Sequence, residues 1–298
     1  MQFGDASTPA RRALNRTMPN PFADPTVVPS PASSPRPVLE TVPAGGGRIV
    51  SERRIAEEVA VAIELDGVGF AVMMATPHDL EDFVVGLLLA EGEIAGPDDL
   101  SSIDVAALDI GMIVRVDRLR PDPVAVMERM RPRTTDSACG LCGRDSLDRA
   151  LLPLPRVTAQ SHADMDALFA AAAALRDHQP LNRATGAVHA AALAAPDGTI
   201  LLVREDVGRH NAFDKLIGAM ARGGIRWDGG FALLSSRCSF ELVDKAVRAN
   251  CPLLATISAP TSLALDRAAA AGLTLATLVR SDTLTLQLCP GSAPELVA

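Results

Sequence analysis

Two cysteines separated by two residues, Cys139 and Cys142, are the sharpest chemical signal in the sequence. A pair at this spacing can form a disulfide, contribute two ligands to a metal ion, or hold a reactive thiolate. Four arginines flank the pair: Arg129, Arg131, Arg133 and Arg144. Nearby guanidinium groups lower the pKa of a thiol, and Gly140 and Gly143 let another molecule approach the sulfur. The pattern therefore favours an exposed nucleophile.

Other interpretations of the cysteine pair stay open from the residues alone. A structural zinc ion needs two further ligands, and no second close Cys or His pair is present, although His189 or His210 could approach in the fold. A thioredoxin-like pair should open a helix directly after a strand, whereas this one lies in a Gly- and Arg-rich stretch without clear periodicity. The remaining alternative is a pair of unreactive thiols in a surface loop.

A second signal lies in the segment Arg204–Asn211, which joins an expected strand to an expected helix. Gly208 permits a tight turn, and Asn211 is expected to cap the helix. The first turn of a helix offers free backbone N–H groups, to which Arg209 and His210 add further donors. This combination suits a phosphate or another anion, and an ordinary capped helix with a solvated surface is the alternative.

Hydroxyl-rich segments follow two later strands, at residues 235–239 and 258–262. In open α/β sheets, ligands lie beyond the carboxyl ends of the strands, so these segments predict one shared crevice. Arg280 follows the last expected strand and could reach the same place. Helix capping by Ser239 and Ser262 is the alternative explanation.

These motifs depend on elements that the sequence pattern also predicts. Residues 1–47 hold nine of the 22 prolines and end in three glycines, which predicts a disordered tail. We expect a smaller β-rich domain at 48–155 that carries the cysteine loop, and an α/β domain at 156–298. The fold class is therefore mixed α/β, with a mixed sheet flanked by helices in the second domain.

Alternating and helical periodicities give the individual elements. In the first domain they predict a helix at 79–91 and strands at 57–65, 68–74, 103–109 and 112–116. In the second they predict helices at 164–177, 211–221, 240–249 and 262–271, and strands at 188–194, 199–204, 231–235, 253–258 and 273–279. Asp66-Gly67 and Pro196-Asp197-Gly198 predict hairpin turns.

Composition excludes several classes of function. The net charge of −8 and the sequence pI of about 5.2 argue against a nucleic-acid binder, and the longest apolar runs fall short of a membrane span. No export signal is evident, so we expect a cytoplasmic protein, and an odd count of five cysteines does not suit a disulfide framework. A nucleotide-dependent hydrolase lacks an assembled nucleophile and base.

The set of motifs resembles the FdhD/NarQ family, whose members are sulfur carriers needed to make active formate dehydrogenases. The resemblance spans roughly residues 50–285, and the early helix region Met74–Glu93 is part of it. The motifs that carry it are Cys139–Gly143, Thr185–Ala190, Glu205–Asn211 with Asp214–Leu216, and Ser235–Arg237 with Phe240-Glu241.

The resemblance implies sulfur transfer. Family members accept sulfur as a persulfide from a cysteine desulfurase and pass it to the molybdenum (or tungsten) bis-guanine-dinucleotide cofactor, which they bind as a substrate without holding a metal of their own. Cys139 matches the persulfide cysteine, and Cys142 would be the assisting thiol. The family further implies homodimers, formate dehydrogenase as a partner, and a second domain that resembles cytidine deaminases without their zinc chemistry.

The resemblance also implies where the guanine-nucleotide part of the cofactor binds. The expected contacts are Gly208, Arg209, His210, Ser235 and Ser236, together with the stretch Leu278, Val279, Arg280, Ser281, Asp282 and Thr283. Asp282 and Thr283 stand where relatives often have Gly and Arg, which leaves Arg280 as the expected anion partner. Cys238 replaces a small residue, and we expect it to serve packing. A chaperone that delivers the cofactor without transferring sulfur is the alternative function.

Overall fold

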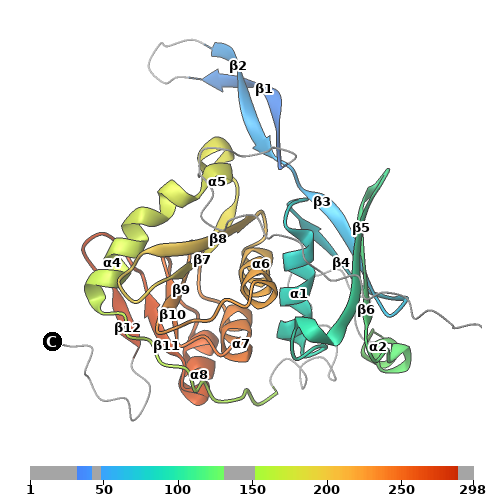
Figure 1. The fold of residues 1–298 in the computed structure, drawn as a ribbon. Helices are drawn as coiled ribbons and strands as arrows, with labels where there is room; N and C mark the ends of the chain where they lie inside the picture. The colour runs from blue at the N-terminus through green and yellow to red at the C-terminus, as the bar shows by residue number, and fades with distance from the viewer. Residues whose placement is uncertain (1–31, 42–47, 131–151, 288–298) are drawn as a thin grey trace, which may run out of the picture.

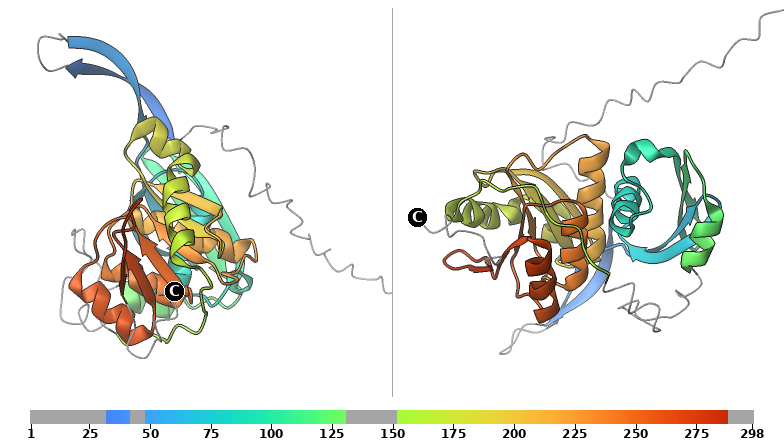
Figure 2. Two further views of the ribbon diagram at one scale, coloured as in Figure 1. Left: turned by 90° about the vertical axis from the view of Figure 1, so that its left-hand side faces the viewer. Right: turned by 90° about the horizontal axis from the view of Figure 1, so that it is seen from below.

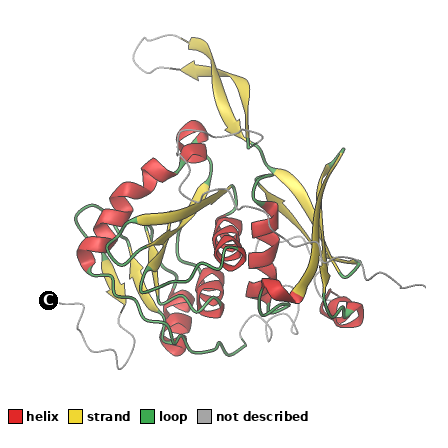
Figure 3. Cartoon of the chain, viewed as in Figure 1, coloured by secondary structure: helices red, strands yellow, loops and turns green. Residues whose placement is uncertain are grey.

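The computed structural model describes residues 32–41, 48–130 and 152–287, which form a mixed α/β fold as the sequence predicted (Figures 1 and 3). Two separate sheets carry the architecture, one of four strands and one of six. Helices lie between the two sheets and on the far side of the larger one (Figure 2). No helix in the described ranges is both long and apolar enough to cross a membrane.

The four-stranded sheet has the order β4-β3-β6-β5. Its strands are β3 (Val59–Leu65), β4 (Val68–Ala75), β5 (Leu100–Leu108) and β6 (Gly111–Arg118). Strand β3 alternates as predicted, and Val61, Ile63 and Leu65 turn inward to form a core with helix α1 (Leu80–Glu91). The short helix η1 (Pro97–Asp99) leads into β5.

The turn between β3 and β4 confirms the hairpin predicted from Asp66-Gly67. The φ angles of Asp66 and Gly67 are 51° and 77°, and two successive positive values are what a two-residue hairpin of the primed type requires. The Asp66 carboxylate also accepts hydrogen bonds from the backbone N–H groups of Arg118 and Asp122, at 2.9 and 3.0 Å. The turn is thereby fixed to the end of β6.

The larger sheet has the order β12-β11-β10-β9-β7-β8. Its strands are β7 (His189–Ala194), β8 (Ile200–Asp206), β9 (Phe231–Leu234), β10 (Leu253–Thr256), β11 (Thr274–Thr277) and β12 (Thr285–Gln287). Strands β9, β10 and β11 are parallel, whereas β7 runs antiparallel to both β8 and β9. The sheet is therefore mixed, as the hairpin at 188–204 predicted.

Helices cover both faces of this sheet. One face packs against α6 (Arg209–Arg222), α7 (Phe240–Arg248) and α8 (Ser262–Ala271). The other packs against α4 (Met165–Ala174) and η2 (Leu175–His178), which lead into α5 (Pro180–Thr185). In Figure 1 the order from left to right is α4, the larger sheet, α6, α1 and the smaller sheet.

Helices α1 and α6 bring the two sheets together through a backbone contact. A Cβ atom on Gly86 would lie 1.8 Å from the carbonyl oxygen of Asp214, and one on Gly218 would lie 1.8 Å from that of Asp82. Only glycine at both positions allows this approach, because real Cβ atoms do not come so close to backbone oxygen. Figure 2 shows the two helices side by side between the sheets.

The structure differs from the predicted tail at residues 33–41. These residues form β1 (Ser33–Thr41), which pairs antiparallel with β2 (Arg48–Ala56) in a hairpin that stands out from the body (Figures 1 and 2). Pro35 and Pro37 are compatible with this strand because alternate residues face the same edge, so both missing N–H groups can lie on the unpaired side. Proline content alone therefore misled the prediction here.

Several short elements were not predicted, η1 among them. Helix α2 (Pro123–Met130) replaces part of the expected Arg-rich loop, including Arg129, because Pro123 opens it and Asp122 accepts the N–H of Ala125. Helix α5 and strand β12 span only six and three residues, too few for a periodicity to develop.

Two helices have N-cap residues other than the predicted ones. Helix α6 begins after Gly208, so Asn211 sits inside the helix instead of capping it. Helix α8 is capped by Thr261, whose hydroxyl oxygen accepts the N–H of Ala264, and not by Ser262. Ser239 does occupy the N-cap position of α7, but its side chain makes no capping hydrogen bond.

Candidate functional site

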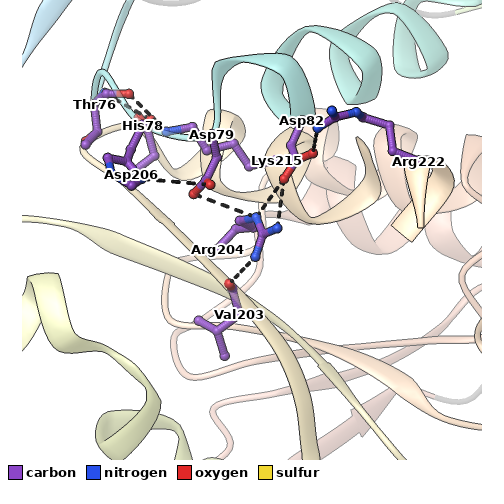
Figure 4. A network of polar contacts seen from close by, with 9 residues as sticks. All are labelled: Thr76, His78, Asp79, Asp82, Val203, Arg204, Asp206, Lys215 and Arg222. Atoms are coloured by element: carbon purple, nitrogen blue, oxygen red, sulfur yellow. Dashed lines mark hydrogen bonds and ion pairs between the residues drawn. The ribbon is translucent and has the colours of Figure 1, made fainter. Parts of the chain in front are cut away.

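A buried ion pair on the larger half of the molecule holds a loop of the smaller half (Figure 4). The Nζ atom of Lys215, on α6, lies 2.6 Å from Oδ2 of Asp206, at the end of β8, and both side chains are fully buried. Lys215 also donates to the carbonyl oxygen of Thr76 at 3.0 Å, and the N–H of Thr76 donates to Asp206 at 3.0 Å. Thr76 follows β4, so this triangle fixes the β4–α1 loop against the larger sheet.

A second set of ion pairs continues the interface along α1. Arg204 donates to Asp82 from two nitrogens at 2.8 and 2.9 Å and lies 3.7 Å from Asp79, and Arg222 binds both Asp82 and Glu81 (Figure 4). Burial acts to raise the pKa of Asp79, but a hydrogen bond from His78 and the positive charge of Arg204 outweigh it and hold this pKa at about 2. The charged side chains along this interface are therefore paired with one another.

The segment Glu205–Asn211, taken from sequence as an anion site, is partly structural. Glu205 accepts the backbone N–H groups of Leu181 and Asn182 at 2.9 and 2.8 Å and so anchors the start of α5. Asn211 donates to Met74 O at 2.8 Å and to Asp206 Oδ1 at 3.0 Å. These acidic and amide side chains hold neighbouring elements together, which leaves Arg209 as the side chain of this segment available for a ligand.

The carboxyl ends of β8, β9, β10 and β11 meet at one edge of the larger sheet, since these four strands share one direction. Backbone hydrogen bonds connect the segments that follow them. Cys238 N donates to Ala259 O at 3.2 Å, and Leu278 N donates to Ser258 O at 3.3 Å. Ser235 accepts the N–H of Ala190 at 2.8 Å. The structure thus brings the predicted strand-end segments together, at the edge termed the carboxyl edge below.

Cationic side chains gather at the carboxyl edge. Burial lowers the pKa of His189, and Arg209, His210 and Arg237 lower it further, against the opposing effect of the Asp206 carboxylate. His189 and Arg237 were not among the expected contacts, although both lie in motifs that the sequence had singled out. An anion arriving here would relieve the repulsion among these groups.

Arg209 supplies a donor that the chain itself does not use. Its Nε atom is buried and has no hydrogen-bond partner among the described residues. Buried polar atoms are nearly always paired, so an unpaired guanidinium nitrogen at a cationic edge fits an absent anionic partner. Gly208 precedes it, and a Cβ atom there would lie 2.8 Å from Nδ2 of Asn211, so a larger residue would displace the Asn211 amide.

His210 is held by its neighbours on α7. Its Nε2 atom lies 3.3 Å from Oγ of Ser239 and 3.7 Å from Oε2 of Glu241. Burial acts to raise the pKa of Glu241, but hydrogen bonds from His210 and Ser239 outweigh it and hold this pKa at about 2. The imidazole therefore has a fixed position beside a permanent carboxylate.

The remaining predicted contacts differ in exposure. Val279 is fully buried and belongs to the core, whereas Arg280, Ser281, Asp282 and Thr283 form an exposed turn in which Arg280 N donates to Thr283 O at 2.9 Å. Leu278, with a φ of 54°, adopts a left-handed conformation that is strained for a branched side chain. Ser236 is buried and donates to the carbonyl oxygen of Arg237 at 3.1 Å. Among these residues, the exposed turn, Leu278 and Ser235 are accessible to a ligand, whereas Val279 and Ser236 are buried.

The two cysteines of the predicted sulfur loop, Cys139 and Cys142, lie outside the described residues. Cys238 and Cys251 are both fully buried, and burial raises the pKa of each thiol to about 12. They are therefore thiols and not thiolates at neutral pH, and the packing role predicted for Cys238 is confirmed. Within the described ranges, no group of three or more His, Cys, Asp or Glu side chains could hold a metal ion.

Comparison with known proteins decides the family. The model of the FdhD/NarQ family matches residues 56–287, which include both sheets and the carboxyl edge. The chain belongs to the FdhD/NarQ family. The match stops short of the protruding hairpin, because β1 and almost all of β2 precede residue 56.

Members of the FdhD/NarQ family with curated names are close in sequence. The chain is 45% identical over 251 residues to the sulfur carrier protein FdhD of Xanthomonas campestris pv. campestris (strain B100), covering 83% of this chain and 89% of that one. It is 45% identical over 239 residues to the sulfur carrier protein FdhD of Variovorax paradoxus (strain S110), covering 79% and 85%.

A solved structure shares the FdhD/NarQ fold seen here. The crystal structure of a protein described as a formate dehydrogenase accessory protein, from Desulfotalea psychrophila, matches with a TM-score of 0.68 and 23% identity. The match covers 90% of this chain and all of that one, so the arrangement of the two sheets is shared across nearly the whole molecule.

Proposed function

We propose that this chain is a sulfur carrier that receives sulfur as a persulfide on Cys139 and passes it to a molybdenum bis-guanine-dinucleotide cofactor before that cofactor enters formate dehydrogenase. The observation that carries the proposal is the 45% identity, over most of both chains, to proteins named sulfur carrier protein FdhD. A cysteine desulfurase is the proposed sulfur donor.

The proposed loading step is a thiol exchange. The Cys139 thiolate attacks the terminal sulfur of the donor persulfide, a new S–S bond forms on Cys139, and the donor cysteine leaves as a thiolate. The step needs a thiolate, which the neighbouring arginines favour. Cys142 would assist the later release of sulfur. The buried Cys238 and Cys251, with thiol pKa values of about 12, do not compete for this role.

The carboxyl edge is the proposed binding site for the cofactor, which is a substrate carrying several phosphates. Arg209, with its unpaired Nε, and the nearby Arg237 supply positive charge in a chain of net charge −8, and His189 and His210 add ring N–H donors. The exposed turn at Arg280 lies at the same edge. These groups support binding of the guanine-nucleotide phosphates there.

A chaperone that delivers the cofactor without sulfur transfer is the second candidate, because a cationic edge needs no sulfur chemistry. Mass spectrometry distinguishes the two after incubation with a cysteine desulfurase and free cysteine. Sulfur transfer predicts a gain of about 32 Da on the peptide that contains Cys139. The peptides with Cys238 and Cys251 should stay unchanged in the folded protein and serve as internal controls. An unmodified Cys139 peptide would contradict the carrier function.

Activation of formate dehydrogenase gives the second test. We expect Cys139→Ala to abolish activation while binding of guanosine diphosphate at the carboxyl edge is retained. Full activation by this variant would exclude sulfur transfer through Cys139 and would leave cofactor delivery as the function.

We further propose that the chain works as a cytoplasmic homodimer, and that its second domain is related in architecture to cytidine deaminases. The six-stranded mixed sheet with helices on both faces is compatible with that relationship. Light scattering during size-exclusion chromatography tests the dimer: a mass of twice 31.1 kDa is expected, and the mass of one chain would contradict it.

A further inference from the structure

A cavity of about 510 Å³ lies on the side of the molecule away from the carboxyl edge. Its walls come from the end of α1, the ends of α6 and α7, the segment 159–160 and the segment 225–229. Residues 225–229 precede β9, and Asn250 precedes β10, so the cavity opens where these parallel strands begin. It therefore shares no residue with the carboxyl edge.

One wall of the cavity is apolar. It contains Leu89 from α1, Ile217 and Met220 from α6, and Ile225 and Trp227 from the segment that follows α6. The side chain of Trp227 is fixed, since its Nε1 donates to Ala249 O at 2.9 Å. A rigid indole and four other apolar side chains can hold a flat apolar body.

Two arginines line the cavity against one carboxylate. Arg226 lies 3.8 Å from Asp228, but their side chains are 85% and 77% exposed, so this ion pair is weak. The charge of Arg248 favours the ionised form of the Asp244 carboxyl group, but this carboxylate already accepts hydrogen bonds from Arg267 at 2.5 and 2.7 Å. The lining consequently has a net positive charge, and within the described residues the guanidinium group of Arg248 has no hydrogen bond that would compete with an acid.

The backbone around the cavity is strained and held in place. Asp228 and Asn250 both have left-handed φ angles, 44° and 49°, which non-glycine residues seldom adopt. The Asn250 side chain accepts the N–H groups of Thr158 and Ala159 at 2.8 and 3.2 Å, and so fixes the opposite wall. Strained residues that their surroundings hold in position are frequent at ligand sites.

We propose that this cavity binds a small organic anion with a flat apolar body. The body packs against Trp227, Ile217 and Met220, and the acid group pairs with Arg248 and Arg226. The volume falls within the range of roughly 300–1,000 Å³ that small-molecule sites occupy. The site is independent of the sulfur chemistry, because none of its residues belongs to the cysteine loop or the carboxyl edge.

The chain itself provides the reporter, because Trp227 is its only tryptophan and it has no tyrosine. Titration of the full-length protein with anilinonaphthalene sulfonate should quench Trp227 fluorescence and saturate at one probe per chain. Arg248→Gln should weaken binding about tenfold, since one charge-assisted contact is lost. Arg156→Gln, at an exposed arginine that does not line the cavity, is the matched control and should bind normally.

An uncharged probe of the same shape separates an anion site from a merely apolar hollow. N-phenylnaphthylamine should bind at least about tenfold more weakly than the sulfonate. Equal affinity for the two probes, quenching that does not saturate, or equal affinity of the Arg248→Gln variant would each overturn the proposal. Persulfide formation on Cys139 is measured separately, so failure of one proposal leaves the other intact.

Discussion

Charged side chains differ in their pairing between the interface that joins the two sheets and the carboxyl edge. At the interface, Lys215, Arg204 and Arg222 each bind at least one carboxylate. At the carboxyl edge, Arg209 keeps a buried nitrogen without a partner in the described part of the chain, and neighbouring cations lower the pKa of His189. Paired charges fix α1 and the loop before it to the larger sheet and α6, whereas unpaired cations cost stability unless a ligand neutralises them. This difference distinguishes charged side chains that hold the fold together from those that we propose to bind a ligand.

The largest effect should follow from breaking the buried pair at the interface. Lys215→Met leaves the Asp206 carboxylate buried without its cation, and we expect a loss of about 3–5 kcal/mol in the free energy of unfolding. Urea denaturation measures the loss. Arg226→Met removes an exposed ion pair and should change stability by less than about 0.5 kcal/mol. Equal effects of the two variants would refute the distinction between buried and exposed pairs.

A pH-dependent effect should follow from Asp214, which lies on α6 beside Lys215 and binds Lys245 at 2.7 Å. Burial raises the pKa of Asp214 from 3.8 to about 6, despite Lys245, so the folded protein holds a proton that the unfolded chain has lost between these values. Its contribution to the free energy of unfolding is therefore greatest below about pH 4 and falls by roughly 3 kcal/mol as the pH rises through 6.

The variant Asp214→Asn tests this titration. It should remove the decline between about pH 4 and pH 7, whatever its effect on absolute stability. Denaturation curves of both proteins across this range give the difference, and parallel pH profiles would show that Asp214 titrates normally.

A smaller loss of stability should follow from separating the two central helices. Gly218→Ala places a methyl group against the Asp82 carbonyl oxygen, so α1 and α6 must move apart, at a cost of about 1–3 kcal/mol. Gly69→Ala, on β4, meets no atom within 4 Å and should be close to neutral. Thermal unfolding compares them, and a Gly218→Ala protein as stable as the parent would mean that the contact is not needed.

The smallest effect on stability should come from the carboxyl edge, where binding should change instead. We expect Arg209→Gln to alter unfolding by less than about 0.5 kcal/mol and to weaken guanosine diphosphate binding about tenfold. Calorimetry measures the affinity, and Arg226→Gln is the control, because Arg226 precedes β9 and so lies at the opposite end of this strand from the carboxyl edge. An unchanged affinity would remove Arg209 from the proposed site.

Local patterns predicted the regular elements of the structure well. The Asp66-Gly67 turn, the helix at 79–91 and the alternating strands and helices after residue 231 correspond to observed elements within a few residues. These elements are long or carry residues whose backbone preferences are strong. The convergence of the strand-end segments at one edge also follows from the direction of parallel strands.

Contacts between segments that are distant in the chain could not be predicted from the sequence. Asn211 is of a residue type that often caps helices, but its side-chain amide donates to the carbonyl oxygen of Met74, which lies 137 positions earlier in the chain. The Asp206–Lys215 pair likewise depends on a turn that local patterns do not define. The unpaired nitrogen of Arg209 and the cations around His189 became visible only when strands and helices were placed together.

The glycine contact between α1 and α6 limits how the molecule can work. Two helices that touch main chain to main chain have no intervening side chains that could slide or change rotamer, so the two sheets turn as one solid piece. Enzymes that close one lobe over another to enclose a reactant move the lobes about a hinge, and such a motion here would have to break this main-chain contact. We therefore expect the two sheets to keep their relative position when a ligand binds.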